Sequence, residues 1–344
     1  MRAAVFHQHG GPLAVEEVPD PAPPRDGVVV EVGATGICRS DWHAWQGHDP
    51  DVAPPHVPGH ELAGTVVAAG PEVGRVALGD RVTVPFCLGC GRCGPCRAGE
   101  TQVCDYDYQP GFTGPGSWAR YVALPHADLN VVALPDELDM VAAAALGCRF
   151  MTAWAAVRIH GRVLEGEWVA VHGCGGVGLS AVMIAAAAGA RVVAVDIDRE
   201  KLGRARQLGA EAAVDARAGG VEAVLEATGG GAHVSLDALG SAETSAASVS
   251  SLRKRGRHVQ VGLMLAGDRV APVPMARVIS HELSLHGVHG MAVRHYPQLL
   301  AAVAARAVDP AQLVGTTIPL ERAGAELEAM GAFARTGATV ITSF

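Results

Sequence analysis

Four cysteines near position 100 have the type and the spacing to bind a metal ion. Cys90, Cys93, Cys96 and Cys104 follow the pattern C-x2-C-x2-C-x7-C. Cysteines three residues apart in a tight turn can present two thiolates to one ion, and four sulfurs complete the closed shell of a structural zinc. An iron–sulfur cluster uses similar spacing but usually belongs to a redox chain. Two disulfides are disfavoured in a large chain that we expect to carry no export signal. The pattern therefore predicts a structural zinc, with Cys87 as a spare free thiol.

A glycine-rich segment further along has the pattern of a nucleotide-binding loop. Residues 173–178, Gly-Cys-Gly-Gly-Val-Gly, match G-x-G-x-x-G, follow a predicted buried strand, Trp168–His172, and open a predicted helix. Gly173 would permit the tight turn, Gly175 would let the backbone approach a pyrophosphate, and Gly178 would allow close packing of the helix on the strand. This context predicts a dinucleotide site.

An acidic residue follows where the sugar of that dinucleotide would lie. Asp196 ends the next predicted strand, and Ile197 follows it. A carboxylate there would bind the adenosine ribose hydroxyls and repel the 2′-phosphate of NADP, and no arginine follows directly to accommodate that phosphate. The segment therefore predicts NAD. The alternatives are that Asp196 is a turn residue, or that Arg199 accommodates NADP.

A third set of candidate residues is scattered along the chain, and each of them is ambiguous by itself. The set consists of Cys38, Arg39, Ser40, Asp41, Trp42 and His43 in one segment, of His60 and Glu61, and of the isolated Cys148. A single buried cysteine is usually a small hydrophobic residue. His60 has no second histidine four residues on, which excludes the helical zinc-protease motif.

The order of these motifs resembles a known family. Residues 36–41, 59–61 and 79–82, the four-cysteine segment and the loop at residues 173–178 occur in the order of the zinc-containing medium-chain dehydrogenase/reductase family, which includes the alcohol dehydrogenases. The resemblance spans essentially the whole chain. It implies that Cys38, His60 and Cys148 bind a catalytic zinc with an open fourth position, which makes two zinc ions per chain. It also implies that Glu61 stands close behind this metal and that Asp41 orients the His60 ring.

The resemblance further implies a zinc-dependent alcohol dehydrogenase, which converts a primary or secondary alcohol reversibly to an aldehyde or ketone. Metal coordination lowers the pKa of bound water from about 15.7 to about 7, and an alcohol responds alike, so that hydride can pass to NAD. The proton would run from Ser40 through the nicotinamide ribose to His43. Other cofactor contacts would come from Arg39 at the pyrophosphate, Thr152 at the nicotinamide and Lys201 at the adenosine ribose, and from Gly176, Val177, Ile197 and Val261. Candidate substrate-wall residues are Phe86, Trp118, Trp42 and Leu263, each as well explained as ordinary core. Phe86 is favoured among them, because the family places an aromatic pocket residue just before the cysteine segment.

Three rival functions differ in what they expect of these residues. Polyol dehydrogenases of the same family often change the third zinc ligand, whereas Cys148 favours the alcohol branch. Zinc-free quinone and enoyl reductases lack the ligand trio and the cysteine segment. A non-catalytic, NAD-binding structural protein would show damage to the trio or to the relay, and none is visible in the sequence.

The pattern of predicted elements indicates two domains. The first third reads as short strands and turns, and the region after about residue 160 alternates strand, glycine-rich turn and helix, which predicts an α/β Rossmann domain with a parallel sheet. By resemblance, residues 1–147 and 288–344 form a GroES-like, β-rich catalytic domain with a zinc lobe at about 87–104. Residues 148–287 form the NAD-binding domain, and the active site lies between the two.

Composition excludes several kinds of partner. Hydrophobic residues make up 49% of the chain and charged residues 18%, which is typical of a folded globular protein. The net charge is −8 and no basic cluster is present, which disfavours nucleic acid. The longest apolar run is interrupted at Gly189 and Arg191 and reads as helix, turn and strand rather than a membrane span. We expect a cytoplasmic protein that acts on a small alcohol, aldehyde or ketone, as a homotetramer or homodimer.

Overall fold

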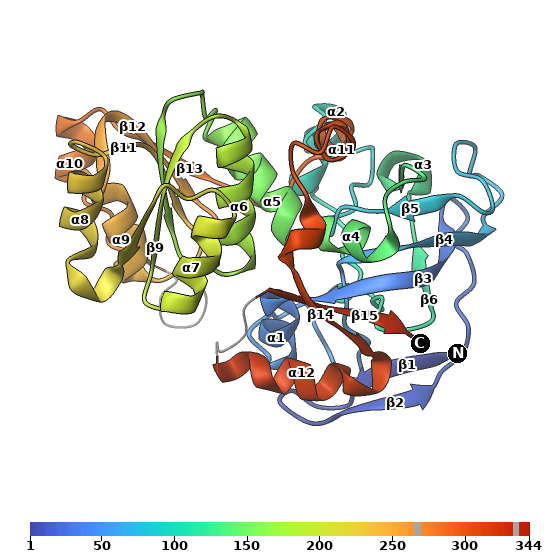
Figure 1. Ribbon diagram of the computed structural model, residues 1–344. Coiled ribbons are helices and arrows are strands. Elements are labelled where there is room, and N and C mark those ends of the chain that lie inside the picture. Colours follow the sequence, from blue (N-terminus) through green and yellow to red (C-terminus); the bar gives the residue numbers. More distant parts are fainter. Residues whose placement is uncertain (265–269, 333–336) are drawn as a thin grey trace. The chain divides into compact units, whose positions relative to one another are not determined.

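The computed structural model describes residues 1–264, 270–332 and 337–344. Two compact units make up the chain: Met1–Met151 together with Gly290–Phe344, and Thr152–His289 between them. Figure 1 shows that each unit has its own sheet and its own helices. The chain therefore leaves the first unit once and returns to it.

The second unit is built on a six-stranded parallel sheet in the order β10-β9-β8-β11-β12-β13. Its strands are β8 (Trp168–His172), β9 (Arg191–Asp196), β10 (Ala212–Asp215), β11 (Ala232–Asp237), β12 (Leu252–Gln260) and β13 (Ser284–Gly287). The main helices are α6 (Gly176–Ala187), α7 (Arg199–Gln207), α8 (Gly220–Ala227), α9 (Ala242–Ser250) and α10 (Met275–Ser280). The strand order reverses between β8 and β11, and such a switch point is where α/β sheets bind dinucleotides.

Burial explains why β8 and α6 form the centre of this unit. All five residues of β8 are buried, as expected for a strand covered by helices on both faces. Helix α6 is apolar almost all round, and eight of its residues are buried. Helices α6 and α7 contact each other, as do α8 and α9, and Figure 1 shows the sheet between these two pairs. The predicted Rossmann fold is confirmed.

The first unit is built mainly on antiparallel strands. Its larger sheet has the order β14-β15-β3-β4-β5-β7, with β6 also on β3, and a separate hairpin pairs β1 with β2. The strands are β1 (Arg2–Phe6), β2 (Leu13–Glu17), β3 (Val28–Ile37), β4 (Leu62–Ala69), β5 (Arg81–Thr83), β6 (Tyr121–Leu124), β7 (Val132–Ala133), β14 (Val314–Pro319) and β15 (Ala338–Ser343). The helices are α1 (Arg39–Trp45), α2 (Gly94–Arg97), α3 (Ala127–Asn130), α4 (Met140–Ala145), α11 (Tyr296–Ala304) and α12 (Ala323–Ala329). Strand β15 pairs antiparallel with β3, so a strand from the end of the chain joins the sheet formed by β3 and β4.

A long helical stretch, Met140–His160, begins with α4 and includes α5 (Met151–Trp154). It is the one described helix that is long and apolar enough to cross a membrane, and 78% of its most apolar window is buried inside the protein, as in a core helix. A π-helical turn, Leu146–Phe150, interrupts it, and Gly147 has a ψ of −143° there. Such turns often occur at functional sites.

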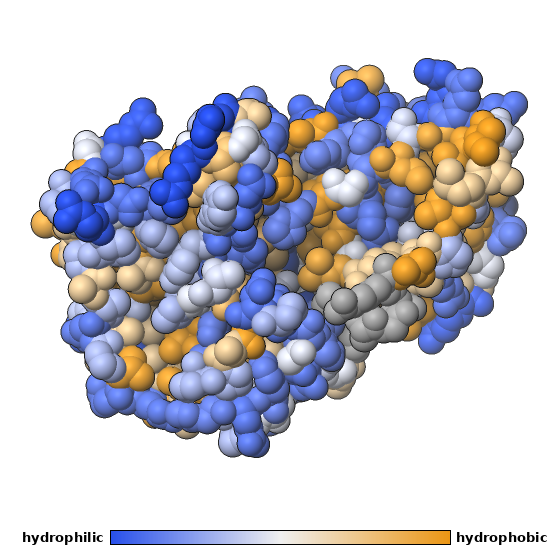
Figure 2. Space-filling view, turned by 180° about the vertical axis from the view of Figure 1, so that it is seen from behind, coloured by the Kyte–Doolittle hydropathy of each residue, from blue (hydrophilic) through white to orange (hydrophobic). Residues whose placement is uncertain are grey.

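The surface mixes polar and apolar side chains. Figure 2 shows one face on which hydrophilic residues predominate and smaller hydrophobic areas lie between them. Single exposed hydrophobic residues of this kind, such as Leu78 and Tyr106, are normal on folded proteins.

Candidate active site and metal centres

Four residues that are far apart in the sequence meet at one end of the first unit's sheet. Cys38 follows directly after β3, His60 and Glu61 directly precede β4, and Cys148 lies on the π-helical turn. Strands β3 and β4 are antiparallel neighbours, which brings their ends together. One ligand atom from each of the four residues lies within 4.8 Å of all the others. The structure therefore brings together the predicted trio of Cys38, His60 and Cys148, with Glu61 beside it.

The His60 ring is held by the carboxylate of Asp41. Asp41 Oδ1 accepts a 2.9 Å hydrogen bond from His60 Nδ1, and its Oδ2 accepts the backbone N–H of Cys38 at 2.8 Å. Both His60 and Asp41 are almost fully buried. Burial lowers the pKa of His60, but the Asp41 carboxylate outweighs this and raises the pKa well above its usual value. The Asp41 carboxylate therefore holds both the ring of His60 and the backbone of Cys38.

The other nitrogen of the ring shows that the cluster fits a metal ion. His60 Nε2 is buried and makes no hydrogen bond of acceptable geometry to any described residue. A hydrogen bond from the Cys148 thiol, with His60 nearby, holds the pKa of Cys38 well below its usual range despite burial. Two sulfurs and a buried imidazole nitrogen without a hydrogen bond form the donor set of a catalytic zinc site that keeps one open position.

Arg149 is a member of the site that the sequence did not reveal. Its side chain forms a buried, two-pronged ion pair with Glu61, in which Nε donates to Oε1 at 2.9 Å and Nη2 contacts Oε2. Burial raises the pKa of Glu61, and Arg149 opposes that rise. The two glycines Gly36 and Gly147 make room for Glu61, because a Cβ on either would meet Glu61 atoms at less than 3 Å. The position of Arg149 directly after Cys148 was the only available signal.

The predicted relay residues lie on α1, which begins at Arg39 directly after Cys38. Ser40 Oγ lies 3.8 Å from Cys38 Sγ. His43 is half-buried, packs edge-on against Trp42 with ring centroids 5.1 Å apart, and shares a hydrogen bond with His48. Arg39 stacks its guanidinium over the Trp42 ring at 5.1 Å. Burial, followed by the neighbouring His48 and Arg39, lowers the pKa of His43 to about 4.

Two phenylalanines pack against the His60 ring. Phe86 was a predicted wall residue, and its ring centroid lies 6.2 Å from that of His60. Phe112 lies closer, at 5.1 Å, and it was missed because nothing in its local sequence marks it. Trp118, in contrast, is fully buried in the hydrophobic core, and its indole N–H donates to Gly36 O. Its position favours the alternative interpretation, a core residue. Leu263 lies in the second unit, beyond β12, and is half-exposed.

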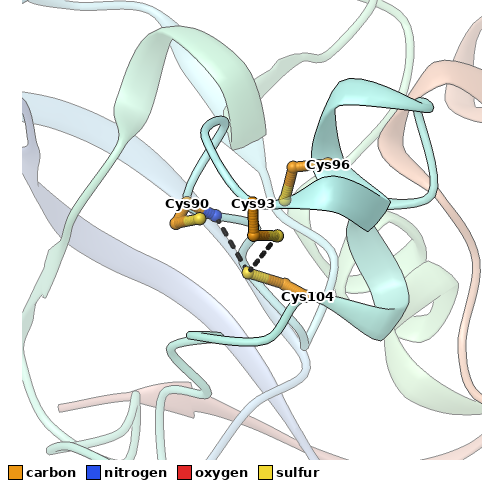
Figure 3. Close-up of side chains that lie close together, drawn as sticks. All are labelled: Cys90, Cys93, Cys96 and Cys104. Carbon is orange, nitrogen blue, oxygen red and sulfur yellow. Dashed lines mark hydrogen bonds between the residues drawn. The ribbon is translucent and has the colours of Figure 1, made fainter.

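The four-cysteine segment closes on itself. Figure 3 shows Cys90, Cys93, Cys96 and Cys104 turned toward one another, and their sulfurs lie within 4.8 Å of one another. Cys104 Sγ accepts the backbone N–H groups of Cys90 and Tyr106 at 3.3 Å each. Burial raises the pKa of Cys90, but backbone N–H groups outweigh it and lower the pKa to about 6. No disulfide is formed among the described cysteines, and this set of thiols fits a tetrahedral ion.

Cys87 does not belong to that group. Its buried thiol lies 3.5 Å from Asp107 Oδ2 and 3.8 Å from Thr101 O. Burial and the Asp107 carboxylate raise the pKa of this thiol. Its sulfur is not among the four that lie within 4.8 Å of one another, in agreement with its interpretation as a spare free thiol.

The glycine loop joins β8 to α6 in the second unit. Gly173 has a φ of +91°, which favours glycine, and a Cβ on Gly178 would lie 1.8 Å from Gly173 O. Helix α6 begins at Gly176, followed by Val177, with Gly175 as the preceding cap residue. Asp196 ends β9, and its carboxylate accepts the loop N–H of Cys174 at 2.6 Å. The acid therefore lies directly against the loop.

The remaining predicted cofactor residues lie on three segments. Ile197 is exposed after β9, Lys201 lies 3.9 Å from Asp198 in the first turn of α7, and Val261 follows β12 and donates its N–H to Asp237 O. Thr152 is buried on α5. These positions include the carboxyl ends of β9 and β12, the edge at which such sheets bind dinucleotides.

Comparisons with known proteins agree with this arrangement. Residues 24–136 match the alcohol dehydrogenase GroES-like domain, and residues 176–305 match the zinc-binding dehydrogenase domain. An alcohol dehydrogenase of Rhizobium meliloti is 40% identical over 265 residues, covering 76% of this chain and 77% of the relative. An alcohol dehydrogenase of Thermus sp. ATN1 has a TM-score of 0.92 at 31% identity, covering 100% of both chains. A structure described as an NAD-dependent alcohol dehydrogenase gives 0.91 at 32% identity with the same coverage.

All of these comparisons indicate the same family: the two domain matches, the full-length structural likeness and the relative at 40% identity. The mainly antiparallel first unit corresponds to the GroES-like part and the parallel sheet to the Rossmann part. This chain belongs to the zinc-containing medium-chain dehydrogenase/reductase family, in its alcohol dehydrogenase branch.

Proposed function

We propose that this protein is an NAD-dependent zinc alcohol dehydrogenase that interconverts a small primary or secondary alcohol with its aldehyde or ketone. The observation that carries the proposal is the buried His60 Nε2, which makes no hydrogen bond of acceptable geometry to a described residue and lies beside the Cys38 and Cys148 sulfurs. A polar atom left without a partner in a protein core costs free energy unless a ligand satisfies it. A zinc ion held by these three residues would do so.

When bound there, zinc supplies Lewis-acid stabilisation of negative charge on a substrate oxygen. The protein supplies the rest. Asp41 keeps the His60 ring in the tautomer that carries its proton on Nδ1, because that nitrogen donates to the carboxylate. Phe86 and Phe112 form an apolar wall against the same ring and exclude water from it.

Ser40 and His43 would remove the proton of the substrate hydroxyl. The Ser40 hydroxyl lies next to the Cys38 sulfur, at the edge of the ligand cluster, where it can hydrogen-bond a substrate oxygen. His43 lies on the same helix, and its half-exposed ring can pass a proton toward solvent. In the proposed path the nicotinamide ribose connects these two side chains.

The second unit would bind NAD. The N-terminus of α6 and the glycine loop offer backbone N–H groups to a pyrophosphate. Asp196, held against that loop, would accept hydrogen bonds from the adenosine ribose and would repel a 2′-phosphate. Arg39, Thr152 and Lys201 would make further contacts to the cofactor.

The four-cysteine segment would hold a second, structural zinc. Four thiols that converge within one short segment give a closed shell with no position for substrate. We further propose that the protein is cytoplasmic, that it forms a homotetramer or homodimer, and that it acts on small molecules rather than on nucleic acid or membranes.

Metal analysis and a substrate panel test the proposal together. The purified protein should contain two zinc ions per chain, and Cys104→Ser should contain one. The activity of Cys104→Ser per folded molecule should equal that of the wild type. With primary and secondary alcohols, polyols and either NAD or NADP, reduced cofactor should form fastest with a simple alcohol and NAD. A protein without zinc at the Cys38 cluster, or one that reduces neither cofactor with any of these substrates, would contradict the proposal.

A further inference from the structure

The turn at the end of helix α1 brings His48 into contact with His43. Helix α1 ends at Trp45, and Gly47 beyond it has a φ of +76°. The N–H of His48 donates to His43 O at 3.0 Å, and the N–H of Gly47 donates to Ala44 O at 3.0 Å. These two bonds form a Schellman motif, in which the residue after the glycine contacts the residue five or six positions earlier on the helix. Here a histidine pair takes the place of the usual apolar contact.

The two rings share a hydrogen bond between like atoms. His43 Nδ1 lies 3.0 Å from His48 Nδ1, and the ring centroids are 5.3 Å apart. One of the two nitrogens must carry the proton, and the other must accept it. Trp42 packs edge-on against both rings, at 5.1 and 5.8 Å, which restricts their rotation.

The surroundings disfavour a lasting positive charge on His43. Burial, His48 and the nearby Arg39 all lower its pKa, and only the Cys38 sulfur opposes them. From the turn after β1, His9 packs against Gly47. The loop after His48 carries Asp49 and Asp51, and the segment Met330–Ala332, which packs near Trp42 through Gly331, has no titratable side chain.

We propose that His48 is the terminal member of the proton relay and connects His43 to solvent. This inference rests on the proposed alcohol dehydrogenase activity. A proton that reaches His43 Nε2 forms a bond there while the proton on His43 Nδ1 passes to His48 Nδ1. His43 is then neutral again with its proton on Nε2, and His48 is the cation. His48 next gives a proton to water from its other nitrogen. The positive charge therefore does not stay on His43, where it is disfavoured.

The test measures proton release in the zinc-loaded enzyme. His48→Asn keeps an amide near the position of Nδ1 and can hydrogen-bond His43, but it cannot take up and pass on a proton. Proton release during a single turnover, followed with a pH indicator, should become about tenfold slower below pH 7. This is a smaller effect than the loss of a general base itself, which typically slows the reaction about 100-fold. Added imidazole should restore the rate. His9→Asn is the matched control, because it changes the neighbouring ring without touching the pair, and it should release protons at the wild-type rate.

A second readout does not depend on turnover. In protein labelled with 15N-histidine, the His43 nitrogens should report a single Nδ1–H tautomer in the wild type and a changed tautomer balance in His48→Gln. If the wild type oxidises no alcohol, the proposed function fails, and this spectrum still decides whether the histidine pair exists. Equal proton release in His48→Asn and the wild type, or no effect of imidazole, would overturn the role of His48.

Discussion

Asp41 and His60 are joined by a 2.9 Å hydrogen bond in a site where both side chains are almost completely buried. The same carboxylate accepts the N–H of Cys38 and of Gly59. It therefore couples the end of β3 to the segment before β4, and it orients the two candidate ligands relative to each other.

Replacing Asp41 should weaken metal binding more than it weakens the fold. Asp41→Asn removes the negative charge that raises the pKa of His60 and fixes its Nδ1 proton. Loss of such an outer hydrogen-bond partner typically costs about 10- to 100-fold in metal affinity or activity. Zinc affinity, measured by competition with a chelator, should fall by that factor. Asp49 is a partly exposed acid in the next loop that accepts the Asp51 N–H, and Asp49→Asn should leave the affinity unchanged.

Breaking the ion pair behind the site should destabilise the first unit strongly. Arg149→Met leaves the Glu61 carboxylate buried without its partner, because the Glu61 side chain has no exposed surface. Removing one partner of a buried pair costs about 3–5 kcal/mol. Urea unfolding should show this loss, and the double variant Arg149→Met, Glu61→Gln should recover part of it.

An exposed ion pair provides the comparison. Arg2 and Glu321 are paired at the surface, with 42% and 52% of their side chains exposed. Arg2→Met should leave the unfolding free energy almost unchanged, as is usual for exposed pairs. Equal losses for Arg2→Met and Arg149→Met would show that burial does not set the strength of the Glu61 pair.

Most of the correct predictions came from motifs whose residues lie close together in the sequence. The residues at 173–178 and the four cysteines each lie within one short segment, so their spacing predicts their geometry directly. The fold class followed in the same way, because strand and helix periods alternate regularly after residue 160. The trio of Cys38, His60 and Cys148 has no such local signal, and only the resemblance to a family joined its members.

Side-chain contacts between distant segments could not be predicted. Glu61 and Arg149 are 88 residues apart, and their ion pair depends on the bend at Gly147. Phe112 reaches His60 from a loop of irregular backbone. Trp118 shows the opposite problem: it was a predicted wall residue, but it is fully buried in the core, where its indole N–H donates to Gly36 O.

Adding one methyl group to the glycine loop should impair cofactor binding. In Gly178→Ala the new Cβ would lie 1.8 Å from Gly173 O, a backbone atom, so the loop or α6 must shift. Overpacking of this kind costs about 1–3 kcal/mol, and calorimetry should show weaker NAD binding. Gly203→Ala is the control, because it lies on α7 with nothing within 4 Å of its Cβ position. It should stabilise the protein by up to about 1 kcal/mol, since alanine favours helix. Unchanged NAD affinity in Gly178→Ala would contradict the proposed role of the loop.

The buried histidines of the second unit should make its stability fall in acid. Burial, together with nearby His258, lowers the pKa of His172 to about 3, and burial also lowers the pKa of His258. His172 Nε2 lies 3.2 Å from Ser251 Oγ, so the neutral ring is accommodated in the core. Above about pH 6.5 both the folded and the unfolded forms are neutral at this residue, and it contributes no pH dependence. As the pH falls below 6.5 the unfolded chain binds the proton first, so folding stability decreases until the pH reaches the folded pKa.

The slope of that decrease gives the measurement. Each such histidine should lower the unfolding free energy by up to about 1.4 kcal/mol per pH unit below pH 6.5. His172→Gln, which cannot titrate, should therefore show a shallower loss between pH 6 and pH 4 than the wild type when urea unfolding is followed at each pH. Zinc release at low pH affects both proteins alike, so the difference between them isolates the residue. His7→Gln, at an exposed ring paired with Glu16, should keep the wild-type slope. Identical slopes for His172→Gln and the wild type would mean that His172 is protonated as readily in the fold as in the unfolded chain.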